Sequence, residues 1–391
     1  MKNATIAKRD EFLVFALPLI EDDEIEEVVK TLKSGWLGSG PKVAQFEEDF
    51  KQYKDADYAV ALSSCTAALH LSLIAAGITA GDEVITTPLT FCATVNAIIH
   101  AGGTPVLADI DPHTLNIDPK EILKKVTSKT KAIIPVHFAG RACEMDEIMD
   151  IAKQHKLIVI EDCAHAIETE YKNQKAGNIG DFGCFSFYVT KNIVTGEGGM
   201  VLTPNKDYAS RIKTLGLHGM TKDAWKRFGD DGYKHYQVVE CGFKYNMMDL
   251  QASIGIHQLK KVDKYWDRRE EIWFRYLEEL KNLPITLPMA TANDTKHGYH
   301  LFTVLLEKEK CGYSRDEFIE ELKNYNIGIG VHYMSIPEHP YYQDTFGWKP
   351  ESTPHAMNAG RNILSLPLSA KLTDQDVSDV INAIRSILDH A

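Results

Sequence analysis

The runs KAIIPVHF (131–138), LIVIED (157–162) and GCFSFYV (183–189) decide the fold of this chain. Each has the length and the β-branched or aromatic content of a buried strand. Working outward, similar runs stand at AVALSS (59–64), EVITTP (83–88), TPVLADI (104–110) and GGMVLT (198–203), and stretches of helical period separate them at 66–76, 91–100, 118–125 and 144–155. This alternation predicts an α/β protein with a mainly parallel sheet and helices on both faces. The close spacing of the last two runs indicates a modified sheet edge with a functional turn, TKNIVTGE (190–197).

The pattern changes after about residue 250. A long helix from Met248 carries the charged stretch KKVDKYWDRREEIW (260–273) and leads to a strand-like run, HLFTVLLE (300–307). Helices are predicted at 315–324 and after Thr373-Asp374. We therefore expect a large α/β domain over 1–250 and a smaller C-terminal α+β domain over 251–391.

Composition excludes several classes of protein. With 43 Lys+Arg against 55 Asp+Glu, the net charge of −12 has the wrong sign for a broad nucleic-acid-binding face. No apolar run approaches the length of a membrane helix, so no membrane insertion is expected. The seven cysteines are scattered without a C-x-x-C pair, which argues against disulfides and a metal site and predicts a cytoplasmic location. FLVFALPLI (12–20) is interpreted as an extended arm rather than a signal peptide.

Three polar groups follow apolar strands and are expected in one crevice, because ligands of open α/β sheets gather at the carboxyl ends of the strands. Asp162 ends LIVIED, Lys191 follows FSFYVT, and the small-residue turn 63–68 opens a helix. Taken singly, an ordinary helix cap and a solvated turn lysine are the commoner interpretations, and Asp162 is as readily a helix cap or a structural acceptor. Together they are what pyridoxal phosphate needs: an amine for its aldehyde, a carboxylate for its pyridine nitrogen and donors for its phosphate.

The sequence also resembles a known family. It is similar to the DegT/DnrJ/EryC1/StrS sugar aminotransferases, which have the aspartate aminotransferase-like fold-type I and use pyridoxal phosphate. The resemblance runs from about residue 12 to the C-terminus. It rests on SGWLGSGPKVAQFE (34–47), SSCTAALHLSL (63–73), GDEVITTPLTF (81–91), PVHFAG (135–140), IEDCAHAI (160–167), FSFYVTKNIVTGEGG (185–199), GFKYNMMDLQASIG (242–255) and GIGVHY (328–333). It implies a seven-stranded sheet in the large domain.

The resemblance implies a role for each of several residues. Lys191 would be the Schiff-base lysine and proton carrier, and Asp162 would pair with the pyridine nitrogen. Phe91 would stack on the cofactor ring, unless it is plain core packing, with His165 nearby. The phosphate would be held by Thr66, by the backbone N–H of Ala67, by Ser186, and by Asn246 of a neighbouring subunit. His332, and more weakly His218 and Lys244, would contact the sugar substrate.

The implied reaction transfers the amino group of L-glutamate to C4 of a nucleotide-linked keto sugar, with UDP as the expected nucleotide, in a homodimer with shared sites. Some relatives with a histidine in place of the lysine are dehydratases, and Lys191 favours transamination instead. Amination at C3 stays open. A nicotinamide-dependent oxidoreductase is disfavoured because no G-x-G-x-x-G occurs. A non-catalytic regulatory protein is disfavoured because both Lys191 and Asp162 are present.

Overall fold

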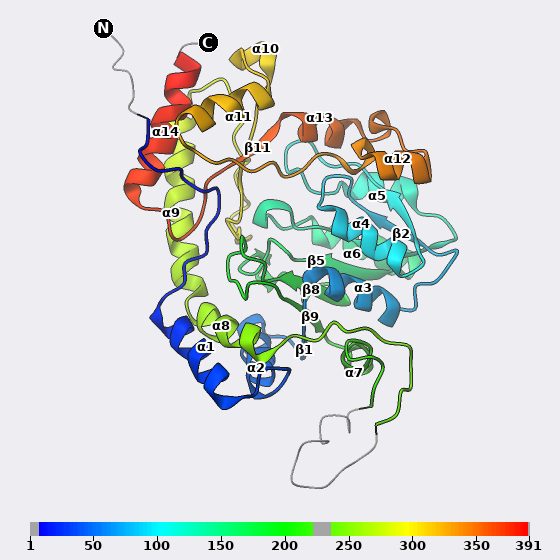
Figure 1. Ribbon diagram of the computed structural model, residues 1–391. Coiled ribbons are helices and arrows are strands. Elements are labelled where there is room, and N and C mark those ends of the chain that lie inside the picture. Colours follow the sequence, from blue (N-terminus) through cyan, green and yellow to red (C-terminus); the bar gives the residue numbers. More distant parts are fainter. Residues whose placement is uncertain (1–7, 222–235, 390–391) are drawn as a thin grey trace.

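A seven-stranded sheet forms the centre of the larger part of the molecule (Figure 1). The computed structural model describes residues 8–221 and 236–389. Across the sheet the strands are β1 (Tyr58–Leu62), β9 (Gly199–Thr203), β8 (Phe182–Ser186), β5 (Ile158–Asp162), β4 (Thr130–Ile134), β2 (Glu83–Thr86) and β3 (Thr104–Leu107). All neighbouring pairs from β8 to β3 are parallel, and only β9 runs against its two neighbours. The predicted mainly parallel α/β fold is confirmed.

The sequence predicted a sheet edge at β9, but the edge lies one strand further, at β1. β9 pairs with β8 on one side and with β1 on the other, over Tyr58–Leu62 opposite Gly199–Thr203. The first strand of the sequence therefore covers the strand that looked like an edge. Local spacing along the chain could not show this, because β1 lies more than a hundred residues earlier.

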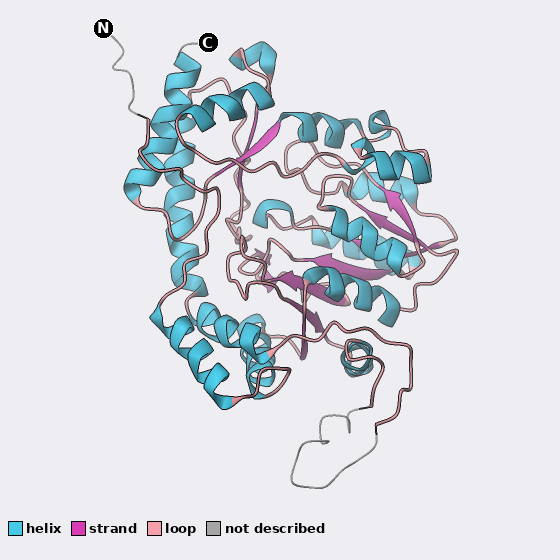
Figure 2. Cartoon of the chain, viewed as in Figure 1, coloured by secondary structure: helices cyan, strands magenta, loops and turns pink. Residues whose placement is uncertain are grey.

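Helices cover both faces of the sheet, as Figure 2 shows. One face packs against α3 (Cys65–Ala75), α4 (Cys92–His100) and α7 (Lys206–Leu215). The other face packs against α2 (Pro41–Lys54), α8 (Asp249–Lys260), α5 (Pro119–Lys125) and α6 (Met145–His155). Alternate residues of one strand enter opposite cores, as with Val159 and Ile160 of β5. The four helices predicted between residues 66 and 155 are found within one residue of their expected bounds.

The long helix predicted from Met248 is two helices. The chain turns at Lys261, where φ is −105° and ψ is 0°, and α9 (Val262–Leu280) continues in a new direction. α8 packs with the sheet core, whereas α9 packs into a separate cluster with β10 (Phe302–Leu305), β11 (Ile363–Leu366), α11 (Arg315–Asn324) and α14 (Asp374–Asp389). The division of the chain near residue 250 stays a prediction.

Shorter elements complete the described chain. They are β6 (Glu170–Tyr171), β7 (Gln174–Lys175), α10 (Lys308–Cys311), α12 (Pro340–Phe346), α13 (Pro354–Asn362) and the 3-10 turns Phe138–Gly140, Ile336–Glu338 and Pro350–Ser352. None of the helices in the two described ranges is both long and apolar enough to cross a bilayer. All seven cysteines are free.

The predicted N-terminal arm precedes α1 (Asp22–Ser34) and runs along the C-terminal part of the chain (Figure 1). Arg9 forms ion pairs with Asp376 and Asp379 of α14. Leu13 exchanges backbone hydrogen bonds with the segment around Ile327, at 2.8 Å each. The arm then turns inward, so that Phe15 packs against the ring of His332, with centroids 5.4 Å apart.

Candidate active site

A cavity of about 590 Å³ opens at the carboxyl ends of β5 and β8. Its walls come from the N-terminus of α3, the start of α4, the turn 186–198, the arm at Phe15 and the segment 330–333. Seven of the predicted site residues line it: Thr66, Phe91, Asp162, His165, Ser186, Lys191 and His332. The crevice predicted from the strand ends therefore exists and contains the predicted amine, carboxylate and hydroxyls.

Asp162 is a buried carboxylate without a cationic partner among the described residues. Its Oδ2 accepts a hydrogen bond from Thr94 Oγ1 at 2.9 Å, and its Oδ1 accepts one from the Ala164 backbone N–H at 3.1 Å. Burial raises the pKa of Asp162, and these hydrogen bonds oppose the rise. A protonated pyridine nitrogen would supply the missing positive charge, so the site fits the cofactor at this point.

Lys191 lies in the turn after β8 rather than at the strand end itself, because β8 ends at Ser186. Burial lowers the pKa of Lys191 to about 8, although the nearby Cys65 and Asp162 act in the opposite sense. A lysine with this pKa carries a larger share of the neutral, nucleophilic amine near pH 7 than a solvated lysine does.

The first turn of α3 offers donors for a phosphate. Its N-terminal N–H groups have no partners within the helix, and Thr66 and Ser186 add hydroxyls at the same end of the cavity. Gly199 is packed against this turn: a Cβ there would lie 2.3 Å from the carbonyl carbon of Ser64. Ala67 does not line the cavity, and its N–H donates to Ser64 Oγ at 3.1 Å. The backbone N–H of Ala67 can therefore donate to a phosphate only if its hydrogen bond to Ser64 Oγ is broken.

Aromatic rings form another wall. Phe91 is 57% exposed at the position that directly precedes α4, because its ring faces the cavity. An exposed flat ring at this point suits stacking on a cofactor ring better than core packing. Tyr333 lies 6.0 Å from Phe91 between ring centroids and accepts a hydrogen bond from His165 Nε2 at 3.1 Å.

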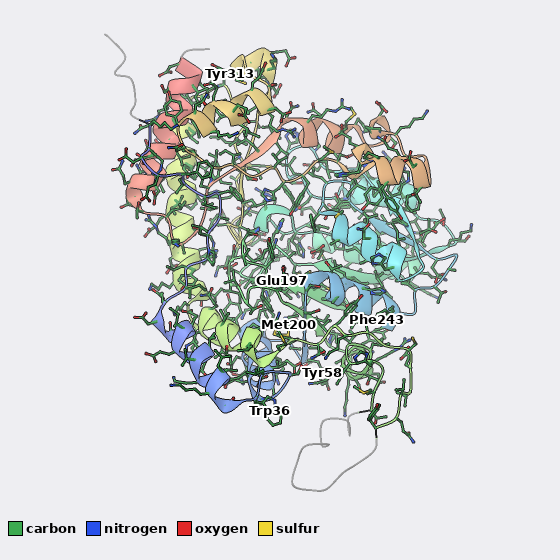
Figure 3. All side chains as sticks on the ribbon, in the orientation of Figure 1. Trp36, Tyr58, Glu197, Met200, Phe243 and Tyr313 are labelled. Carbon is green, nitrogen blue, oxygen red and sulfur yellow. The ribbon has the colours of Figure 1, made fainter. Side chains whose placement is uncertain are left out.

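Besides Ala67, three further predicted residues lie outside this cavity. Asn246 lines a second cavity of about 620 Å³ together with Trp36 and Ser39. Asn246 bonds to Ser39 Oγ at 2.6 Å and to Lys244 Nζ at 2.5 Å. Lys244 and His218 are exposed on neighbouring backbone segments. In Figure 3, Trp36 lies near the end of α1, whereas Glu197, which lines the first cavity, lies nearer the middle.

Sequence reasoning missed several residues of the first cavity, including Phe15 and His300, and it gave Tyr333 no role of its own within the segment 332–342 that it considered for the sugar pocket. Tyr333 could have been predicted from the sequence, because it ends the quoted motif GIGVHY. Phe15 and His300 had no signal of their own, since each stands in an apolar run that predicts only an arm or a strand.

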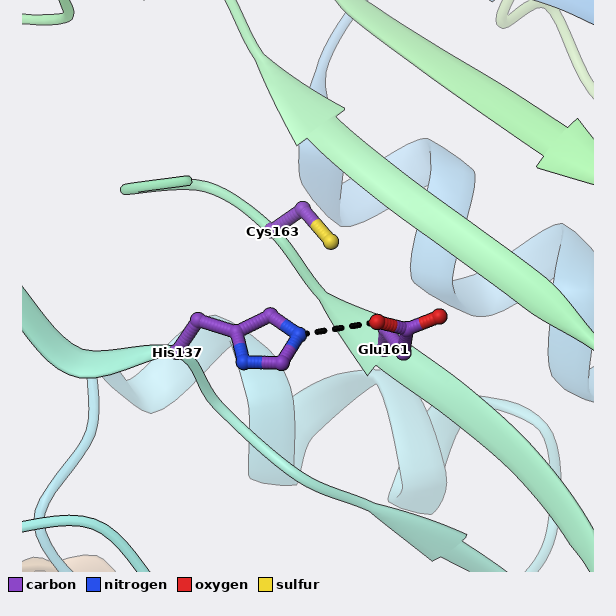
Figure 4. Close-up of side chains that lie close together, drawn as sticks. All are labelled: His137, Glu161 and Cys163. Carbon is purple, nitrogen blue, oxygen red and sulfur yellow. Dashed lines mark hydrogen bonds and ion pairs between the residues drawn. The ribbon is translucent and has the colours of Figure 1, made fainter. Parts of the chain in front are cut away.

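One buried cluster beside the site has the residue types of a metal centre, but its histidine and its carboxylate already have hydrogen-bond partners. His137, Glu161 and Cys163 lie together under the sheet end (Figure 4). His137 Nδ1 accepts the Cys143 backbone N–H at 3.1 Å, so its Nε2 carries the hydrogen that Glu161 accepts at 2.9 Å. Backbone N–H groups of residues 177, 179 and 180 fill the remaining positions of the carboxylate. The hydrogen bonds of this cluster therefore stabilise the end of the strand that carries Asp162.

A lysine and a carboxylate facing one cavity of a mainly parallel α/β sheet, with phosphate donors at a helix N-terminus, are the groups that a pyridoxal phosphate enzyme of fold-type I requires. The comparisons with known proteins specify it further. The chain belongs to the DegT/DnrJ/EryC1/StrS aminotransferase family, whose model matches residues 18–385. It is therefore a pyridoxal phosphate-dependent sugar aminotransferase.

Relatives and solved structures agree with this family. The spore coat polysaccharide biosynthesis protein SpsC of Bacillus subtilis is 50% identical over 384 residues, which cover 98% of this chain and 99% of that protein. The putative sugar aminotransferase Spr1654 of Streptococcus pneumoniae, solved in PMP and PLP forms, has a TM-score of 0.90. Its PMP form is 32% identical, with 97% of this chain and 98% of that chain covered. PseC of Helicobacter pylori, an aminotransferase involved in the biosynthesis of pseudoaminic acid, matches with a TM-score of 0.90 and 28% identity over 98% of this chain and all of that one.

Proposed function

We propose that this chain transfers the amino group of L-glutamate to C4 of a nucleotide-linked keto-deoxy sugar, with UDP as the nucleotide, and releases 2-oxoglutarate. The amino sugar would serve a surface polysaccharide, a glycan or a modified lipid. The observation that carries the proposal is the meeting of Lys191 and Asp162 in one cavity with phosphate donors at α3. The name of SpsC supports a polysaccharide as the destination. A cytoplasmic location remains an expectation from the cysteine pattern.

The residues that line the cavity have different roles, according to their charge and position. When bound, pyridoxal phosphate supplies an aldehyde that carries the amino group and a ring that withdraws electrons. Asp162 would hold a proton on the ring nitrogen, Phe91 would stack on the ring, and Thr66 and Ser186 would donate hydrogen bonds to the phosphate. Lys191 Nζ removes the proton from the α-carbon of glutamate and, in the second half of the reaction, delivers a proton to the former keto carbon of the sugar.

The first test is a visible absorption spectrum of the purified protein before and after L-glutamate is added. We expect a yellow protein whose absorption is lost with glutamate and returns with 2-oxoglutarate. Lys191→Ala should abolish this change, whereas the exposed control Lys264→Ala should not alter it. A yellow protein that does not respond to glutamate would contradict the proposed donor.

The aspartate has its own test. Asp162→Asn should still bind cofactor but react far more slowly with glutamate, because a neutral amide does not hold the ring nitrogen protonated. An unchanged rate would contradict the role of Asp162. With an active enzyme, screening keto-sugar nucleotides and assigning the product by NMR distinguishes amination at C4 from amination at C3.

We further propose that two copies share their active sites. Asn246 lines a different cavity from Lys191 of its own chain, and α1 buries Glu24, Glu27 and Thr31 while it exposes Ile25, Val29 and Leu32. An apolar stripe on the outer face of a helix suits a second subunit.

Mixed dimers test this sharing. Neither Lys191→Ala nor Asn246→Ala alone should be fully active, and co-refolding the two variants should restore one intact site in each hybrid. If mixing restores no activity, the sites are not shared.

A further inference from the structure

A line of hydrogen-bonded polar side chains, all buried except the half-buried Asn192, connects α9 to the wall of the active-site cavity. Arg269 of α9 pairs with Glu168 Oε1, and both side chains are at most 3% exposed. Glu168 Oε2 accepts a hydrogen bond from Asn192 Nδ2 at 2.7 Å. Asn192 Oδ1 lies 2.8 Å from His300 Nδ1. The line therefore begins at a fixed charge pair and ends at a histidine of the cavity.

The hydrogen bonds of Asn192 determine which nitrogen of His300 carries the hydrogen. The Nδ2 of Asn192 must point at Glu168 and at the Gly298 carbonyl oxygen, 2.8 Å away, because both of these groups only accept. The amide oxygen then faces His300 and cannot donate. His300 Nδ1 must carry the hydrogen, so its Nε2 has a free lone pair.

The lone pair of His300 Nε2 is available to a ligand in the cavity. His300 is only 5% exposed and lines the cavity with Lys191 and His332. Within the described ranges no hydrogen bond reaches His300 Nε2, and the atom is not among the fully buried, unpartnered ones. Burial and the nearby Lys191 hold the pKa of His300 well below its ordinary value, so the ring stays neutral.

The neighbouring histidine has the opposite arrangement. The rings of His165 and His300 lie 4.4 Å apart between centroids. His165 Nδ1 accepts the Ala139 backbone N–H at 3.2 Å, and its Nε2 donates to Tyr333 Oη at 3.1 Å. Both nitrogens of His165 are therefore used, and His300 alone of this pair has a nitrogen available to a substrate.

We propose that His300 is a substrate-binding residue whose Nε2 accepts a hydrogen bond from a donor group of the substrate. Given the proposed function, on which this inference rests, the donor is either the amino group of the amino acid or a hydroxyl of the keto sugar. Groups that only accept, such as a carboxylate or a ring oxygen, are repelled from this position. The Arg269–Glu168–Asn192 line holds the ring in this state.

Two variants separate substrate binding from a purely structural role. His300→Asn keeps an amide N–H near the place of Nδ1, so it still bonds to Asn192 but lacks an acceptor at the cavity. His300→Gln places its amide near the position of Nε2 and keeps that acceptor. We expect His300→Asn to lower kcat/KM about tenfold in one half-reaction, the loss expected for one hydrogen bond, while His300→Gln stays within about threefold of the wild type.

The half-reactions identify the donor. A loss with L-glutamate, followed by absorption without any sugar, assigns the bond to the amino group. A loss only in the reaction of the keto-sugar nucleotide with the amine-loaded enzyme assigns it to a sugar hydroxyl. If His300→Asn equals the wild type in both half-reactions, or if His300→Gln is impaired as much as His300→Asn, the proposal is overturned.

A second measurement does not depend on activity. In cofactor-free full-length protein labelled with ¹⁵N-histidine, the His300 signal, assigned by its absence in His300→Gln, should show a protonated Nδ1 and an unprotonated Nε2. A protonated Nε2 would overturn the proposal even if the enzyme is active. Conversely, an inactive wild type with the expected tautomer would disprove the proposed function and leave the geometry of His300 intact.

Discussion

Replacing Arg269 by methionine should destabilise the protein strongly, because it leaves a buried carboxylate without its cation. Glu168 has a fully buried side chain and would keep only the hydrogen bond from Asn192. Removing one partner of such a pair costs about 3–5 kcal/mol, whereas removing both charges costs far less. The variant Arg269→Met with Glu168→Gln should therefore recover much of the loss, and it also removes the unpartnered Nε of Arg269.

Arg268 provides the matched control on the same helix. Its side chain is 26% exposed, and its partners Glu271 and Asp374 stand largely in water. Water and salt screen such pairs, so Arg268→Met should cost much less. The assay is urea unfolding of the cofactor-free protein followed by circular dichroism, since bound cofactor would add stability of its own. An Arg269→Met variant that is no less stable than Arg268→Met would refute the reasoning.

Further predictions concern the phosphate turn, the active lysine and the exposed helix. Gly199→Ala should weaken cofactor binding measured by absorbance titration, because its Cβ would lie 2.3 Å from Ser64, whereas Gly38→Ala, with open space around it, should not. The rate at which pyridoxal phosphate attaches to the cofactor-free protein should rise with pH up to about 8 and then level off, because the lowered pKa of Lys191 frees its amine there; a continued rise toward pH 10 would contradict this. Leu32→Glu should shift the protein to monomers in sedimentation without unfolding it, because Leu32 is 52% exposed in the single chain; an unchanged dimer would exclude α1 from the interface.

The sequence predicted the sheet and the centre of the site because both depend on local patterns. Strands that end in polar residues, such as the one ending at Asp162, bring their last side chains to the same edge whatever the rest of the chain does. The helix starts were equally local, and the helix 315–324 was predicted to the residue. The resemblance to a family added roles that spacing alone left undecided.

The features that the sequence did not predict depend on contacts between distant segments. The pairing of β1 with β9 and the turn at Lys261 follow from packing that no local pattern contains. The same holds for His300, whose ring at the cavity is hydrogen-bonded to Asn192, more than a hundred residues earlier. Asn192 itself was visible as the neighbour of Lys191, but its function becomes clear only from its three hydrogen-bonded partners.

The N-terminal arm has a consequence for the order of events on the ribosome. Residues 9–16 are synthesised before the sheet, yet the partners that hold them, around Ile327 and at Asp376 and Asp379 of α14, emerge more than three hundred residues later. Phe15 therefore has no contact with His332 while the strands of the sheet, the last of which ends at Thr203, are being synthesised. The wall that it contributes closes only after the segment around His332 has left the ribosome, so a nascent chain that ends before this segment cannot complete the substrate cavity.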